Sequence, residues 1–156
     1  MVLHSAGLLP FRTDEAGALS VFLVRMAGPY WEGQHEGAWS IAKGLFEPGS
    51  EDAEDAARRE FAEEVGVVFA GALSELGEVV LRSRKVVHVF AGRAGADLVF
   101  VGSNHFEMEW PRGSGQQQSF PEVDDGRWFA LDEARRVISA GQRPALDLLE
   151  AATTTA

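Results

Sequence analysis

Three glutamates lie close together near the middle of the chain, in the segment 59–66 (REFAEEVG). In a helix with about 100° per residue, Glu60, Glu63 and Glu64 fall within an arc of about 100° on adjacent turns. Carboxylates on one face repel each other, and at ~6 Å with an effective dielectric of 20 each pair costs roughly 3 kcal/mol. A hard divalent cation prefers oxygen ligands and would remove this repulsion. The pattern therefore predicts a Mg²⁺ or Mn²⁺ site.

The position of two of these glutamates at the end of the predicted helix is a second electrostatically unfavourable feature. The helix is expected over 50–65, with Asp52 capping the first turn and Gly66 ending it in the left-handed conformation. Glu63 and Glu64 then stand in the last turn, where the helix dipole disfavours anions by about 0.3–1 kcal/mol each. The acidic residues of the first helical turn, Asp52, Glu54 and Asp55, are instead interpreted as a solvated face of the helix. A structural helix with fortuitous acids remains the alternative for the whole segment.

Two basic residues outside this helix are candidates for binding an anionic substrate. Lys43 precedes the helix in a glycine-containing loop and could contact a phosphate, or be a solvated loop lysine. Arg25 ends a predicted buried strand and could face the same substrate-binding cleft as Lys43. Tyr30, Trp31 and Trp39 could stack on a nucleobase or complete the core.

The surrounding pattern predicts the elements that position these residues. Apolar and β-branched runs indicate strands, a glycine-punctuated loop spans 27–38, and the main helix comes after the short strand that follows this loop. Strands stand both before and after the main helix, which predicts an α/β (α+β) fold: a mixed β-sheet sandwiched between helices. We expect strands at 5–11, 19–26, 39–42, 73–81, 85–93 and 127–130, an irregular stretch at 101–122, and helices at 132–140 and 144–150.

Length and composition exclude several classes of protein. The chain has 156 residues, so residues 1–150 are expected to form one domain, followed by a disordered tail at 151–156. It has no cysteine, which excludes disulfides, thiolate metal sites and a catalytic thiol. A net charge of −10 argues against nucleic-acid binding. No apolar segment approaches the ~20 residues of a membrane span, and no signal peptide is visible, so a cytoplasmic protein is expected.

The segment 44–67 resembles the Nudix box, the signature of the Nudix hydrolases. That pattern reads Gly-x5-Glu-x7-Arg-Glu-apolar-x-Glu-Glu-x-Gly-apolar, and its second half matches at residues 59–67. Glu51 stands eight residues before Arg59, as the pattern requires. The glycine does not match, because the pattern places it at Leu45 and Gly44 is one residue early. One extra loop residue near Ser50 would restore the alignment.

The resemblance implies a Nudix-like fold and specific roles. Mg²⁺ or Mn²⁺ would be bound by Glu60, Glu63 and Glu64, with a further contact from the carbonyl of Gly44. Arg59 would pair with Glu51 and brace the loop rather than touch substrate. Nudix enzymes often place an additional carboxylate outside the box as base or metal ligand, and Glu109 or Glu122 would fill that role beside Glu63 and Glu64.

The activity implied is hydrolysis of a diphosphate linkage in a nucleoside diphosphate derivative, with Lys43 and Arg25 binding the substrate. A non-hydrolytic, Nudix-like nucleotide-sensing module is the alternative. The partner is a small nucleotide-type molecule rather than nucleic acid or membrane, and a homodimer is left open. The absence of a proline between Pro48 and Pro111 argues against one ADP-ribose hydrolase pattern, but no single substrate is selected.

Overall fold

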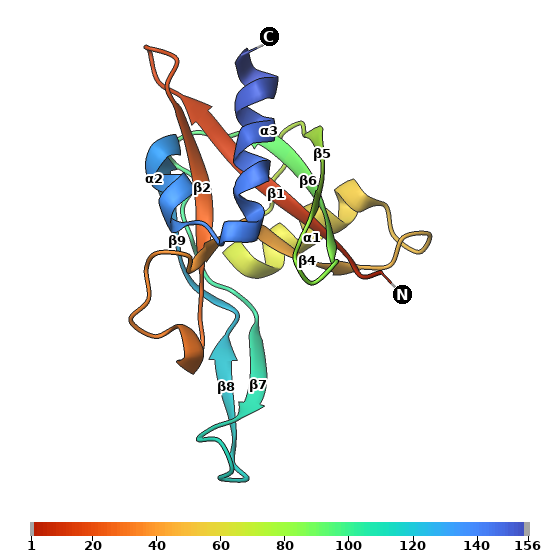
Figure 1. Cartoon of the computed structure of the whole chain (residues 1–156), viewed down its shortest axis with the longest axis vertical. Coiled ribbons are helices and arrows are strands. Elements are labelled where there is room, and N and C mark those ends of the chain that lie inside the picture. The colour runs from red at the N-terminus through yellow and green to blue at the C-terminus, as the bar shows by residue number, and fades with distance from the viewer. Residues whose placement is uncertain (1, 155–156) are drawn as a thin grey trace.

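The computed structural model describes residues 2–154 and is built around a seven-stranded sheet (Figure 1). The strand order is β3-β2-β1-β6-β5, with β4 paired to the N-terminal half of β1 and β9 paired to β2. Among the paired strands of this sheet in residues 2–154, only β1 and β6 run parallel, and the other pairs are antiparallel. The strands of this sheet are β1 His4–Thr13, β2 Leu19–Met26, β3 Trp39–Ser40, β4 Ala42–Phe46, β5 Ser74–Val80, β6 Val86–Arg93 and β9 Val123–Ala130.

Three α-helices cover the two faces of this sheet. They are α1 Ala53–Val65, α2 Leu131–Val137 and α3 Arg143–Thr154. Neighbouring residues of a strand point to opposite faces, so Leu8 packs in the core beneath α1 and Leu9 in the core beneath α2 and α3. Phe61 of α1 and Leu146 of α3 are fully buried in these two cores. The predicted mixed sheet between helices is confirmed.

Helix α1 begins and ends where its capping residues allow. The Asp52 side chain accepts a hydrogen bond from the Asp55 N–H, and Gly66 adopts a left-handed φ of 81°. The helix starts three residues later than the predicted Ser50, because the backbone N–H groups of Ser50 and Glu51 both donate to the Glu47 carbonyl in a preceding turn. The loop before the helix is therefore longer than expected.

The stretch 101–122 is not irregular throughout, as the sequence pattern suggested. It contains an antiparallel hairpin of β7 (His105–Glu109) and β8 (Gln117–Pro121), which projects from the body of the molecule (Figure 1). Most residues of both strands are exposed and none is fully buried, so the alternation of Phe106 and Met108 with polar residues in β7 is a short and weak strand signal. Strand β9 also begins earlier than predicted, at Val123 rather than Arg127.

The C-terminal helix is longer than predicted. Helix α3 continues through Thr154, where the sequence suggested a disordered tail from residue 151; residues 155–156 lie outside the described part of the chain. The Thr153 and Thr154 hydroxyls donate to the Glu150 carbonyl within the last turn. No helix within residues 2–154 has both the length and the apolar character needed to span a bilayer.

Gln142 is expected to stabilise the junction between the sheet and the C-terminal helices. It is 5% exposed, accepts a hydrogen bond from the Ile41 N–H at 2.9 Å and donates one to the Ser40 hydroxyl at 3.0 Å. Gln142→Met keeps the volume but leaves a buried N–H unsatisfied, so urea denaturation should show a loss of about 1–3 kcal/mol. Gln117→Met, at an exposed position of β8, is the control, and equal stability of the two variants would contradict this role.

Candidate functional site

Gly44 of β4 lies directly against Glu60 of α1. A Cβ atom added to Gly44 would stand 2.0 Å from Glu60 Oε2, far inside any real contact. Only glycine therefore lets the strand approach the carboxylate this closely. The glycine that stands one residue early in the sequence is thus placed beside the predicted metal helix.

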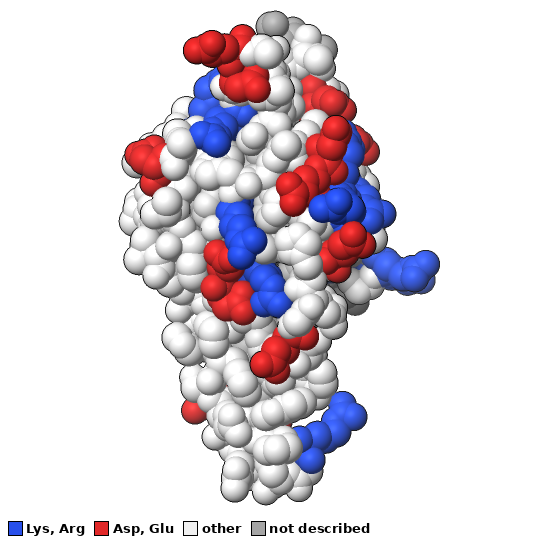
Figure 2. Space-filling model, turned by 90° about the vertical axis from the view of Figure 1, so that its left-hand side faces the viewer, with Lys and Arg blue, Asp and Glu red and all other residues white. Residues whose placement is uncertain are grey.

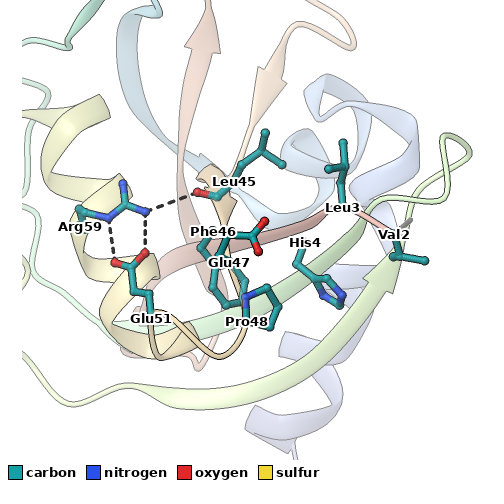
Figure 3. Close-up of a pocket in the computed structure, with 9 residues that line it drawn as sticks. All are labelled: Val2, Leu3, His4, Leu45, Phe46, Glu47, Pro48, Glu51 and Arg59. Carbon is teal, nitrogen blue, oxygen red and sulfur yellow. Dashed lines mark hydrogen bonds and ion pairs between the residues drawn. The ribbon is translucent and has the colours of Figure 1, made fainter.

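The loop between β4 and α1 contains a turn at 47–51, the region in which the sequence suggested an extra residue near Ser50. Gly49 has a φ of 94°, and Glu51 leaves the turn directed at Arg59. The Arg59 guanidinium donates to Glu51 Oε2 at 2.8 Å and to Oε1 at 3.0 Å, and also to the Leu45 carbonyl at 3.4 Å (Figure 3). Hydrogen bonding to Arg59 lowers the pKa of Glu51. The same arginine thus joins the loop, the strand and the helix.

Arg59 also contacts two of the three glutamates of the helix. Its Nη1 donates to Glu60 Oε1 at 2.8 Å and to Glu63 Oε1 at 3.3 Å. The repulsion that the spacing predicts is therefore partly relieved by an arginine of the same helix. The Glu63 side chain is 40% exposed, so solvent further weakens its interactions.

Glu64 is in a different environment, because it is buried and has no arginine partner. Its Oε1 accepts a hydrogen bond from the Lys43 backbone N–H at 3.2 Å. Burial, followed by the nearby charges of Glu122 and Glu60, raises its pKa to about 8. Burial also raises the pKa of Glu60, against the opposing effect of Arg59. Two adjacent buried carboxylates thus lack full compensation by positive charge.

A cleft of about 310 Å³ opens beside Glu64. Lys43 and Glu122 line it together with the apolar or aromatic side chains of Met26, Trp31 and Phe106. Burial and the neighbouring Lys85 lower the pKa of Lys43, while Glu64 and Glu60 oppose that shift. The cleft thus combines a cation, two carboxylates and aromatic surface, which suits a ligand with a phosphate and a ring system.

Two other predicted site residues have different surroundings. Both carboxylate oxygens of Glu109 accept backbone N–H groups, from Gly113 at 2.9 Å and Gly115 at 3.2 Å, so Glu109 caps the turn of the β7–β8 hairpin and is not grouped with Glu60 and Glu64. Arg25 donates to Asp124 at 2.8 Å and to the carbonyls of Trp31 and Gln34. It braces the loop 27–38.

Sequence reasoning missed Phe106, which lines the cleft from β7. The residue lies in the stretch interpreted as irregular, where Phe106 alternates with acidic residues as Met108 and Trp110 do, and nothing in that pattern distinguishes it as a site residue. Trp31 was proposed either to stack on a base or to complete the core, and it lines the cleft while packing against the core. Trp39 is fully buried and belongs to the core.

The donor set fits a hard divalent cation in chemistry, although it is not assembled as a cage. Within residues 2–154, no three His, Asp or Glu side chains are arranged to hold an ion. The available groups are carboxylates, which suit Mg²⁺ or Mn²⁺, and the raised pKa values of Glu60 and Glu64 mark charge that an ion would stabilise. Because Gly44 lies against the Glu60 carboxylate, the backbone of β4 lies beside these carboxylates as well.

The family model described as NUDIX domain matches residues 3–149. The chain belongs to the Nudix family. Solved Nudix structures share its fold at low identity. A Caenorhabditis elegans Ap4A hydrolase binary complex is 22% identical, with a TM-score of 0.63 and coverage of 97% of this chain and 99% of that one. A search of curated proteins finds no match.

Two further Nudix structures are similar over most of their lengths. The NUDIX domain of Shewanella oneidensis NrtR, complexed with ADP ribose, is 18% identical with a TM-score of 0.62, covering 96% of this chain and 87% of that one. The MutT protein from Methanosarcina mazei Go1 is 18% identical with a TM-score of 0.56, covering 96% and 93%. Identities this low establish the shared Nudix fold rather than a particular substrate.

Proposed function

We propose that this Nudix protein is a metal-dependent hydrolase that cleaves a diphosphate linkage in a nucleoside diphosphate derivative. The observation that carries the proposal is the pair of buried carboxylates, Glu60 and Glu64, at the edge of a cleft that contains Lys43. Membership of the family supports hydrolysis of phosphorus anhydrides in general. The face in Figure 2 carries interspersed acidic and basic side chains and no continuous basic stripe of the kind that binds nucleic acid.

Residues of the cleft, together with neighbouring residues of α1 and β4, have distinct tasks in this reaction. Lys43 binds phosphate oxygens, and Trp31 and Phe106 provide surface for the nucleobase. Glu60 and Glu64, with Glu63 and the Gly44 carbonyl, are the groups that would hold Mg²⁺ or Mn²⁺. When bound, the ion supplies neutralisation of phosphate charge and activation of water.

Glu122 is the better placed of the two carboxylates suggested outside the box. It lines the cleft with Glu64 and interacts electrostatically with Glu60 and Glu64. We assign it the role of general base, which accepts the proton of the attacking water. Glu109 is not retained in this role, because its oxygens are used by the hairpin turn.

One observation favours the alternative, a sensor that binds a nucleotide without cleaving it. Arg59 already compensates Glu60 and Glu63, which lowers the need for an ion at those two side chains. A panel of nucleotides incubated with Mg²⁺, Mn²⁺ or EDTA, with products identified by mass spectrometry, separates the two functions. Metal-dependent cleavage supports the hydrolase, whereas tight binding without product supports the sensor.

Metal binding is expected to release protons at neutral pH. Because the pKa of Glu64 is raised to about 8, this carboxyl is mostly protonated at pH 7, and an ion that binds the carboxylate must displace the proton. Calorimetric Mg²⁺ titrations in buffers of different ionisation enthalpy should report release of about one proton per ion at pH 7, falling toward zero by about pH 9. Identical heats in all buffers at pH 7 would show that the ion binds elsewhere.

A further inference from the structure

Arg25 lies next to the cleft but directs its charge at other parts of the protein. Its side chain is 17% exposed and lines a neighbouring hollow of about 350 Å³ rather than the cleft that contains Lys43. Nη1 donates to Asp124 Oδ2 at 2.8 Å, and Nη2 donates to the carbonyls of Trp31 and Gln34, each at 2.9 Å. Nε also donates to the Gln34 carbonyl, at 3.2 Å. Every nitrogen of the guanidinium thus has a partner within the protein, so Arg25 is poorly placed to bind a phosphate itself.

One end of this network is fixed by the sheet. Arg25 belongs to β2 and Asp124 to β9, and these two strands pair along most of their lengths. The ion pair between them therefore joins two residues whose backbones are already in place. It orients the guanidinium, and the part of the network whose position depends on that guanidinium is the loop 27–38.

The middle of this loop has few other polar attachments. Within the described chain, Arg25 donates all the hydrogen bonds that join residues 28–34 to the seven-stranded sheet. The remaining hydrogen bonds of this segment are local, such as those from the Trp31 N–H to the Gly28 carbonyl and from the Gln34 N–H to the Trp31 carbonyl. Local bonds shape the segment but do not fix it against the rest of the molecule. Its polar attachment to the sheet therefore depends on one side chain.

The same loop supports the aromatic surface of the cleft. Trp31 lines the cleft, and Arg25 is bonded to the backbone carbonyl of that residue. Gly28 lies against Phe106, a second aromatic residue of the cleft, since an added Cβ at Gly28 would stand 3.4 Å from Phe106 Cζ. Where Arg25 holds the loop thus determines where Trp31 stands and what supports Phe106.

We propose that Arg25 is a positioning residue for the nucleobase: it holds Trp31 at the cleft through the loop backbone and so determines the affinity for the base without contacting the substrate. This inference rests on the proposed function, which assigns the base to Trp31 and Phe106. It replaces the sequence-based expectation that Arg25 binds the substrate directly. An arginine suits this task because its planar fork donates in fixed directions, whereas a lysine ammonium is a point charge on a flexible stem.

Binding of two probes to the full chain with Mg²⁺ separates the base from the phosphate. One probe is ribose 5-phosphate, and the other is whichever of AMP, GMP, CMP and UMP binds the wild-type protein most tightly by calorimetry. We expect the base to improve Kd by about tenfold or more, the effect of stacking on an aromatic surface. Arg25→Gln should reduce this ratio by at least about fivefold and leave the Kd of ribose 5-phosphate within about twofold. Arg25→Lys should behave like Arg25→Gln, because it keeps the charge and loses the fork.

A double-mutant cycle tests whether Arg25 acts through Trp31. Arg25→Gln should change the ratio of Kd values in the wild-type background and not in the Trp31→Ala background. Arg58→Gln is the matched control, because Arg58 likewise donates to a backbone carbonyl, that of Phe69 at 2.7 Å, and to the carboxylate of Glu54, but does not line the cleft. It should keep the wild-type ratio. Amide NMR spectra show whether Arg25→Gln is folded, and its changed signals are expected at residues 28–34.

Several outcomes would overturn the inference. Equal loss of affinity for both probes, or full rescue by Arg25→Lys, would show that Arg25 acts through its charge. An unchanged ratio in Arg25→Gln, a loss that persists in the Trp31→Ala background, or a wild-type protein that binds ribose 5-phosphate as tightly as every nucleotide would also overturn it. None of these results decides the hydrolytic function, which fails if no nucleotide is cleaved with either Mg²⁺ or Mn²⁺.

Discussion

Glu64→Gln is expected to lower kcat by roughly 10²- to 10⁴-fold while the protein remains folded. Glutamine has the same shape and can still accept the hydrogen bond from the Lys43 N–H, so the loss would report the missing charge rather than a rearranged strand. Steady-state kinetics on the best substrate of the nucleotide panel measures the effect. Full activity of Glu64→Gln would show that this carboxylate is not part of the reacting site.

The same substitution is expected to stabilise the metal-free protein at alkaline pH. The pKa of Glu64 is raised to about 8 in the folded state, above its ordinary value of 4.5, so its favourable contribution is complete below pH 4.5 and is lost as the pH rises through 8. Urea denaturation in EDTA should therefore show a gain for Glu64→Gln on the order of a few kcal/mol at pH 9, and little difference near pH 4.5. Glu63→Gln, at an exposed position, is the control and should show no such gain.

Gly44→Ala is expected to reduce metal affinity and activity by about 10- to 100-fold. The added Cβ would stand 2.0 Å from Glu60 Oε2, so either the carboxylate or strand β4 must move. Lys43 directly precedes Gly44, so the hydrogen bond from the Lys43 backbone N–H to Glu64 would be disturbed as well. Calorimetric titration with Mn²⁺ and steady-state kinetics measure the two effects separately.

Gly102→Ala is the matched control for this substitution, because an added Cβ at Gly102 would meet no atom within 4 Å. It should retain wild-type metal affinity and activity. If Gly44→Ala behaved like Gly102→Ala, the close approach of β4 to Glu60 would have no functional importance, and the assignment of Gly44 to the metal site would fail.

The parts of the fold that local sequence determines were predictable. Asp52 and Gly66 cap α1 through their own side-chain and backbone chemistry, and both act within a few residues. The buried strands β1 and β2 follow from continuous apolar runs. The β7–β8 hairpin was not predictable in this way, because it is mostly exposed and its pairing does not depend on a buried face.

The candidate site was predictable in its helix and less so in its surroundings. The spacing of Glu60, Glu63 and Glu64 identifies a shared face, but burial of Glu64 depends on β4 and Glu122, which are distant in sequence. The contact of Arg59 with Glu60 and Glu63 also depends on side-chain conformation, so the predicted repulsion was too large. Phe106 joins the cleft only through the hairpin.

The measurement that tests the central claim most directly is anomalous diffraction from crystals of the protein grown with Mn²⁺. We expect an anomalous peak within coordination distance of the Glu60 and Glu64 carboxylates, and loss of that peak in Glu64→Gln crystals. A protein that hydrolyses nucleotide derivatives but binds Mn²⁺ only elsewhere, with Arg59 still paired to Glu60, would contradict the claim that the helix α1 carboxylates form the metal site.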